Sequence, residues 1–124
     1  MSKLQRVTLH AARSKAFPDG SIRHGYSFVA PLNAEGKIDP EAWKAHRGEC
    51  IVRRFWGDEP EMRGLLVHRP GGHKGSSWLF ELGEELDEEE PGFRFADHAF
   101  KPGEYVSLRE QDGELMTFRV ISVA

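Results

Sequence analysis

The chain has 124 residues, of which 17 are Lys or Arg and 20 are Asp or Glu, and its formal net charge is −3. This length is typical of one domain with one core, so we expect a single domain over residues 1–124. Hydrophobic residues at 39% and charged residues at 30% exclude a mostly disordered chain. The 13 glycines and 7 prolines predict many turns and therefore short strands.

The cysteine content and the length of the apolar runs predict the cellular compartment of the protein. Cys50 is the only cysteine, so an internal disulfide or a thiolate metal cluster cannot form. The first residues lack the apolar stretch of a signal peptide, and no run approaches the ~20 apolar residues of a membrane span. We therefore expect a cytoplasmic protein that does not enter a membrane.

Alternation of apolar and polar residues predicts strands through most of the chain. The segments with this pattern are 7–11, 22–28, 51–56, 78–82, 93–95, 105–109 and 115–119, and a short apolar run at 65–67 predicts a further strand. Ile22, Tyr26 and Phe28 should share one face, with His24 on the same side. The apolar run at 65–67 is typical of a central strand. Between residues 51 and 56 the pattern leaves open which face is buried.

One helix is predicted over about residues 40–47. Asp39 suits the N-cap, Pro40 suits the first helical position, and Gly48 should end the helix. Because a helix of under about three turns is marginal alone, we expect Trp43 to attach it to the sheet.

The C-terminal segment predicts a β-hairpin, and the two possible registers place different residues on each face. A two-residue turn would pair Leu108 with Thr117 and mix apolar with polar side chains. A three-residue loop over 111–113, with Gly113 left-handed, pairs Leu108 with Met116 and gives one apolar face. We therefore predict the second register.

Many short strands and one short helix predict a mainly β fold, a small, mostly antiparallel β-barrel or rolled sheet of about seven strands. Residues 100–106 read Phe-Lys-Pro-Gly-Glu-Tyr-Val, which resembles the strand entry of the flavin-binding barrel in ferredoxin-reductase-like enzymes and of the barrels in translational GTPases. The resemblance implies a tight turn before a barrel strand. The flavin-holding Arg-x-Tyr-Ser element is replaced by Phe-Arg-Val-Ile-Ser at 118–122, so the cofactor stays unknown.

A glycine-rich basic loop at residues 69–77 is the main candidate for ligand binding. Glycines allow successive backbone N–H groups to converge on an anion, and basic and hydroxyl side chains can complete a phosphate or carboxylate site. The candidate residues are Arg69, Gly71, Gly72, His73, Lys74, Ser76 and Ser77. The alternative is a solvated loop between two strands, and the spacing differs from that of a P-loop.

Arg53, Arg54 and Arg63 form a second candidate, a basic patch near Phe55 and Trp56. Oligonucleotide-binding barrels use basic grooves with exposed aromatic side chains on which bases stack. The alternative is a solvated arginine face with one of the aromatic side chains packed in the core.

The acidic residues and the histidines do not indicate a further site. The acidic run at about 83–92 is typical of a solvated, self-repelling loop. The six histidines lack the spacing typical of a zinc site, so no metal site is predicted; the alternative is an ion shared by His68 and His73 with Asp97 or His98, if the fold brings them together. Cys50 precedes two apolar residues and should be a buried, inert thiol.

These features favour a non-catalytic module that binds an anionic ligand, such as a nucleotide, RNA or another phosphate-bearing molecule, through the loop at 69–77. One alternative is an assembly protein that forms a homodimer through an exposed sheet edge. Another is a small enzyme in which His68 or His73 acts as acid or base. Catalysis is the less favoured interpretation because the sequence contains no motif that names a reaction.

Overall fold

The computed structural model describes residues 2–69, 77–82, 94–96, 99–110 and 114–124. Most of them lie in strands, with one short α-helix, α1 (Pro40–Ala45), and one 3-10 turn, η1 (Arg47–Glu49), among these residues. The strands are β1 (Lys3–Ala11), β2 (Ser21–Leu32), β3 (Ile51–Trp56), β4 (Glu59–Arg69), β5 (Ser77–Leu82), β6 (Arg94–Ala96), β7 (Tyr105–Arg109) and β8 (Leu115–Val123). The predicted mainly β fold with one short helix is confirmed.

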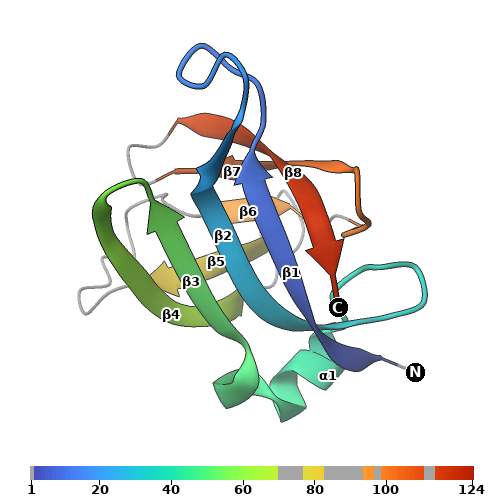
Figure 1. Ribbon diagram of the computed structural model, residues 1–124. Coiled ribbons are helices and arrows are strands. Elements are labelled where there is room, and N and C mark those ends of the chain that lie inside the picture. The colour runs from blue at the N-terminus through green and yellow to red at the C-terminus, as the bar shows by residue number, and fades with distance from the viewer. Residues whose placement is uncertain (1, 70–76, 83–93, 97–98, 111–113) are drawn as a thin grey trace.

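The strands form a strongly curled antiparallel sheet in which each strand pairs with the next one along the chain (Figure 1). β1 also pairs with β8, so the strand order closes into a barrel. β6 is the shortest of the described strands, and among the described residues it pairs with β7 through Arg94 and Arg109. Each described strand therefore has a neighbour on both sides. A homodimer through a sheet edge stays a prediction, and it would have to form on a strand that is already partly paired.

Alternate residues of the strands point into the barrel and form the core. Val7 and Leu9 of β1 are fully or almost fully buried, as the alternation predicts. Aromatic rings from separate strands meet at the centre. The ring centroid of Tyr26 lies 5.0 Å from that of Phe80 and 5.3 Å from that of Phe118. Tilted and edge-to-face contacts of this kind stabilise a core beyond the area that they bury.

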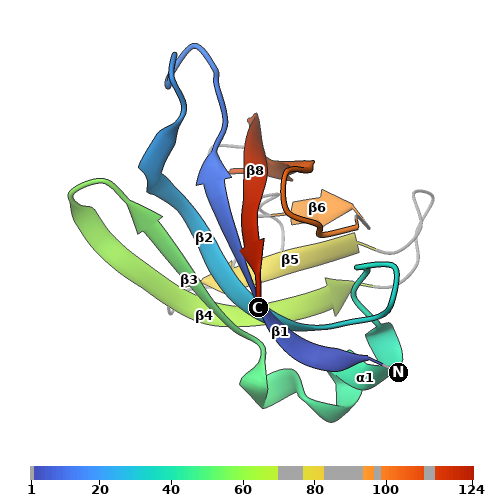
Figure 2. The ribbon, with the colours of Figure 1, turned by 45° about the vertical axis from the view of Figure 1, so that its right-hand side comes forward.

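Two glycines allow neighbouring strands to approach closely. A Cβ atom on Gly25 would lie 1.9 Å from the carbonyl oxygen of Leu9, and one on Gly64 would lie 1.7 Å from that of Glu81. Both distances are far inside van der Waals contact, so only glycine fits without a backbone shift. Gly64 belongs to β4, which curls around the barrel in Figure 2.

The helix α1 lies at one end of the barrel, opposite the loop that joins β1 to β2 (Figures 1 and 2). The Asp39 side chain accepts hydrogen bonds from the backbone N–H groups of Glu41 and Ala42, which confirms the predicted N-cap. Trp43 is buried, and its Nε1 donates to the carbonyl oxygen of Leu66 at 2.9 Å. Trp43 therefore attaches the helix to the sheet as predicted.

The helix is shorter than the predicted range of 40–47. It ends at Ala45, and Gly48 lies inside the following 3-10 turn instead of ending the helix. The reason is a change of hydrogen-bond spacing, since the N–H of His46 donates to the carbonyl of Trp43, three residues earlier, at 3.0 Å. In the described parts of the chain, no helix is both long and apolar enough to cross a membrane.

The C-terminal hairpin has the predicted register. Leu108 pairs with Met116 and Val106 pairs with Phe118. Three of these four side chains are buried and Met116 packs against the same core, so the hairpin presents one apolar face to the barrel interior. The loop at 111–113, including its predicted left-handed glycine, lies outside the described residues.

A tight turn leads into β7, as the resemblance of residues 100–106 implies. Gly103 has a φ of 92°, a left-handed conformation that favours glycine. The N–H of Glu104 donates to the carbonyl oxygen of Lys101 at 3.0 Å, which closes the turn.

The structure shows how two of the predicted strands are buried. Ile22 is exposed while Tyr26 of the same strand is buried, because the register of β2 against β1 shifts between His10 and Ala11. The run at 65–67 lies in β4, which pairs with β3 on one side and β5 on the other. Leu66 points into the core, whereas the neighbouring Leu65 is 39% exposed on the outer face. The run therefore belongs to a central strand, as predicted, and one face of that strand is buried.

Candidate functional site

The outer face of β1–β4 carries a row of polar and basic side chains. Ser27 of β2 lies opposite Thr8 of β1 on one side and opposite Arg53 of β3 on the other. Arg53 in turn lies opposite Arg63 of β4. Because neighbouring strands are about 4.8 Å apart, this register places the two predicted arginines side by side. We define the arginine face as Arg6, Ser27, Arg53, Glu61 and Arg63.

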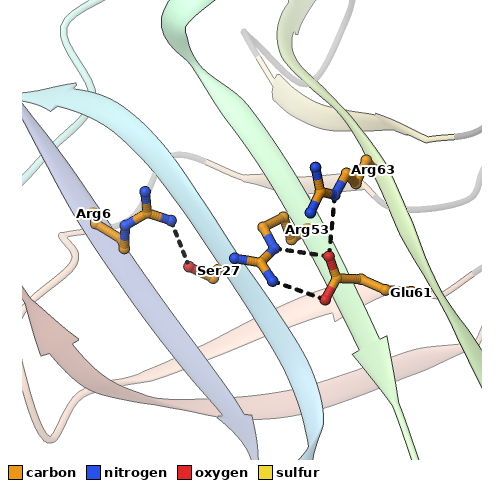
Figure 3. Close-up of polar contacts among 5 residues, drawn as sticks. All are labelled: Arg6, Ser27, Arg53, Glu61 and Arg63. Carbon is orange, nitrogen blue, oxygen red and sulfur yellow. Dashed lines mark hydrogen bonds and ion pairs between the residues drawn. The ribbon is translucent and has the colours of Figure 1, made fainter. Parts of the chain in front are cut away.

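Figure 3 shows the polar contacts of the arginine face. Arg53 donates through Nε and Nη2 to the two carboxylate oxygens of Glu61, at 2.8 and 3.0 Å. Arg63 donates through Nε to the same carboxylate at 3.2 Å. Arg6 extends from β1 and donates through Nη1 to the Ser27 hydroxyl at 3.3 Å. The Glu61 carboxylate therefore accepts hydrogen bonds from two guanidinium groups, whereas the third guanidinium group, that of Arg6, donates to an uncharged hydroxyl.

The arginine face carries a net positive charge. The hydrogen bond from Arg53 lowers the pKa of Glu61, so this carboxylate is ionised at neutral pH. The ion pairs found among the described residues do not include Arg6, and the Arg63 side chain is 71% exposed. The bidentate pair of Arg53 with Glu61 can stabilise the sheet, but it does not account for Arg6, which donates to an uncharged hydroxyl. Planar guanidinium groups do suit phosphate and carboxylate anions.

Arg54 does not belong to the predicted basic patch. It alternates with Arg53 along β3 and points into the barrel, where its side chain is 5% exposed. Its Nη2 donates to Glu110 at 2.7 Å, and its Nε donates to the Tyr26 hydroxyl at 3.2 Å. Its guanidinium group also lies over the Trp56 ring, 4.1 Å from the centroid. The strand pattern left this outcome open because both faces of β3 carry an arginine and an aromatic residue.

Arg54, Tyr26 and Glu110 form a buried polar network. The Tyr26 hydroxyl donates a hydrogen bond to Glu110. Burial and the adjacent charge of Glu110 raise the pKa of Tyr26 well above its ordinary value, so the phenol stays protonated. The three groups direct their hydrogen bonds at one another and so replace the water that burial removes. This arrangement indicates a structural role.

Most of the predicted loop site lies outside the described residues. This applies to Gly71, Gly72, His73, Lys74 and Ser76, and the acidic segment at 83–92 also lies outside them. Arg69 and Ser77 form the last pair of the β4–β5 ladder, so the loop joins two antiparallel strands. Binding of an anion by this loop stays a prediction.

His68 and Cys50 lie with the core rather than with the arginine face. The His68 ring centroid is 4.4 Å from that of Trp78 and 5.9 Å from that of Trp43. Cys50 is buried as predicted, and burial raises the pKa of its thiol to about 11. In the part of the chain that the structure describes, no three His, Cys, Asp or Glu side chains gather as metal ligands would.

Sequence reasoning did not find Arg6, Ser27 and Glu61. Arg6 precedes the alternating segment at 7–11 and is polar where its neighbour Val7 is buried, which is a signal that it points outward. Its position beside Ser27 and near Arg53 depends on two strand registers. The sequence pattern of these strands does not determine those registers.

Comparison with known proteins does not assign this chain to a family. No family model, curated protein or solved structure matches it significantly. Its function must therefore be inferred from the chemistry of its own residues, and the arginine face offers the clearest chemistry among those described.

Proposed function

We propose that this protein is a non-catalytic module that binds a phosphate-bearing polyanion, of which single-stranded RNA is the expected class, and that the arginine face forms part of the binding surface. The observation that supports this proposal is the set of three guanidinium groups against one carboxylate on one sheet face. An open sheet face suits an extended polyanion, because small ligands need a concave site that buries most of their surface. The glycine-rich loop at 69–77 follows β4 and is a second predicted contact.

Apolar side chains beside the arginine face provide surface for bases. Ile51 of β3 lies opposite Leu65 of β4, one outward position along from Arg53 and Arg63, and both are exposed. Phosphates bind to guanidinium groups, whereas unstacked bases need an apolar or aromatic surface. The neighbouring rows thus offer both kinds of contact, which favours RNA over a simple inorganic anion.

Binding of a fluorescently labelled single-stranded oligouridine, measured by anisotropy, tests the proposal. We expect binding that weakens steeply between about 50 and 200 mM salt, because each phosphate contact of a single strand contributes about −0.7 to the slope of log K against log salt. The double variant Arg53→Gln/Arg63→Gln should weaken binding and reduce that slope by about 1.4. Arg23→Gln is the matched control, since Arg23 is exposed, pairs with Asp58 and lies outside the arginine face.

Glu61→Gln should change the affinity for RNA in the opposite direction. This change removes the carboxylate that competes with phosphate for Arg53 and Arg63, so RNA binding should become tighter. A gain of affinity cannot result from loss of folding. Absence of binding at low salt, or equal affinities for the unchanged protein and the double arginine variant, would overturn the proposal.

A further inference from the structure

A groove lies on the side of the barrel where β1 is next to β8, and β8 is next to β7. It has a volume of about 430 Å³ and is lined by the end of β1, the start of β2, the loop between them, and residues of β7 and β8. This volume falls within the range of about 300–1,000 Å³ that is typical of small-molecule sites. The groove is separate from the residues of the arginine face.

Two shifts in strand register shape the groove. At the end of β1 the pairing with β2 skips residues 22–24, and Ile22 is 78% exposed as a result. After Thr8 the pairing of β1 with β8 skips Ile121, which is also exposed. Bulges re-aim side chains and are frequent beside functional sites. Here both shifts direct an isoleucine to the same groove.

Half of the exposed large hydrophobic side chains among the described residues line the groove. Among the described residues six large hydrophobic side chains are exposed, and three of these, Ile22, Tyr105 and Ile121, line the groove. Tyr105 is 61% exposed, so its ring is accessible. Scattered exposed hydrophobic residues need no explanation, but several gathered around one concavity indicate a ligand or partner.

Cationic groups lie beside this apolar surface. Arg119 lies between Tyr105 and His10 in the strand register, so the three occupy neighbouring positions on the outer face. Arg13 also lines the groove, and Asp19 is the one carboxylate among the described lining residues. The ion pairs found among the described residues include neither arginine. The groove therefore has two guanidinium groups and one carboxylate, and this excess of positive charge favours binding of an anion.

We propose that this groove binds a small planar aromatic anion, with a nucleoside monophosphate as the representative ligand. Tyr105 and the two isoleucines would contact the planar ring, and Arg119 and Arg13 would bind the phosphate. The ring of Tyr105 and the guanidinium group of Arg119 belong to paired residues on adjacent strands. This spacing suits one ligand in which a ring and an anionic group are joined.

Calorimetric titration with adenosine monophosphate, adenosine and inorganic phosphate tests this inference. We expect the monophosphate to bind at least about tenfold more tightly than either of its parts, because joining the two contacts makes the second one intramolecular. Tyr105→Ser should weaken monophosphate binding by roughly tenfold through loss of ring contact. Arg119→Gln should have an effect of similar size through loss of the phosphate contact, and should leave adenosine binding unchanged.

Leu115→Ala is the matched control for these variants. Leu115 is an exposed residue of β8 that does not line the groove, so its loss should not change monophosphate affinity. Substitutions at exposed positions such as these usually leave the fold intact. The proposal is overturned if the monophosphate binds no more tightly than phosphate alone, or if the Tyr105 and Arg119 variants bind it as the unchanged protein does.

One variant distinguishes failure of the RNA proposal from failure of the nucleoside monophosphate proposal. Arg53→Gln/Arg63→Gln should reduce RNA binding but leave monophosphate binding unchanged, because neither residue lines the groove. If that double variant lost the monophosphate as well, the ligand would lie on the arginine face, and the groove would be excluded as its site.

Discussion

Arg54 and Glu110 form an ion pair that is almost inaccessible to water, with 5% and 6% of their side chains exposed. We expect Glu110→Gln to lower the free energy of unfolding by about 3 kcal/mol, because the Arg54 charge stays buried after the opposing charge is lost. Urea unfolding followed by tryptophan fluorescence measures this change.

Glu59 provides the matched control for this prediction. Its carboxylate lies 3.8 Å from Nη1 of Arg54 but is 62% exposed, so Glu59→Gln should change stability by less than about 0.5 kcal/mol. The triple variant Tyr26→Phe/Arg54→Met/Glu110→Leu should recover most of the lost stability, because it removes both buried charges together with the hydroxyl that hydrogen-bonds to them. Equal losses in Glu59→Gln and Glu110→Gln would show that burial of the charge is not the cause.

The strands β4 and β5 approach closely at Gly64. Because a Cβ atom there would lie 1.7 Å from the carbonyl oxygen of Glu81, Gly64→Ala must displace backbone and should destabilise the protein by more than about 3 kcal/mol. Thermal and urea unfolding measure the loss. Gly48→Ala is the control, since its Cβ would meet no atom within 4 Å, and its effect should be within about 1 kcal/mol. Similar results for the two variants would contradict the importance of this close approach.

The strands differ in how much of their pairing and burial could be predicted from the sequence. The pairing of Leu108 with Met116 could be predicted because only one register places apolar residues on one face of both strands. The inward direction of Arg54 could not be predicted, since arginine and aromatic residues alternate on both faces of β3. The exposure of Ile22 was missed for another reason. It results from a register shift against β1, and such a shift depends on the partner strand.

At the scale of the whole molecule, both candidate sites are assembled from strands that are distant in sequence. Arg53 and Arg63 could be recognised as a pair of basic residues within one stretch of chain. The contribution of Arg6 requires the β1–β2 and β2–β3 registers, and the groove requires β1 to close against β8. Alternation indicates the outward residues of a strand where only one of its faces is apolar, but closure of the barrel determines which outward residues become neighbours.

Closure of the barrel also sets how the protein should fold. The pairing of β1 with β8 joins Val7 to Val123, residues near the two ends of the chain, and this contact forms only after a large loss of chain entropy. We therefore expect refolding as a single exponential in milliseconds to seconds, as is usual for β-rich domains with many distant contacts. Stopped-flow tryptophan fluorescence can follow it, because Trp43 and Trp78 are both buried. Refolding within microseconds would show that the closing contacts do not limit the rate.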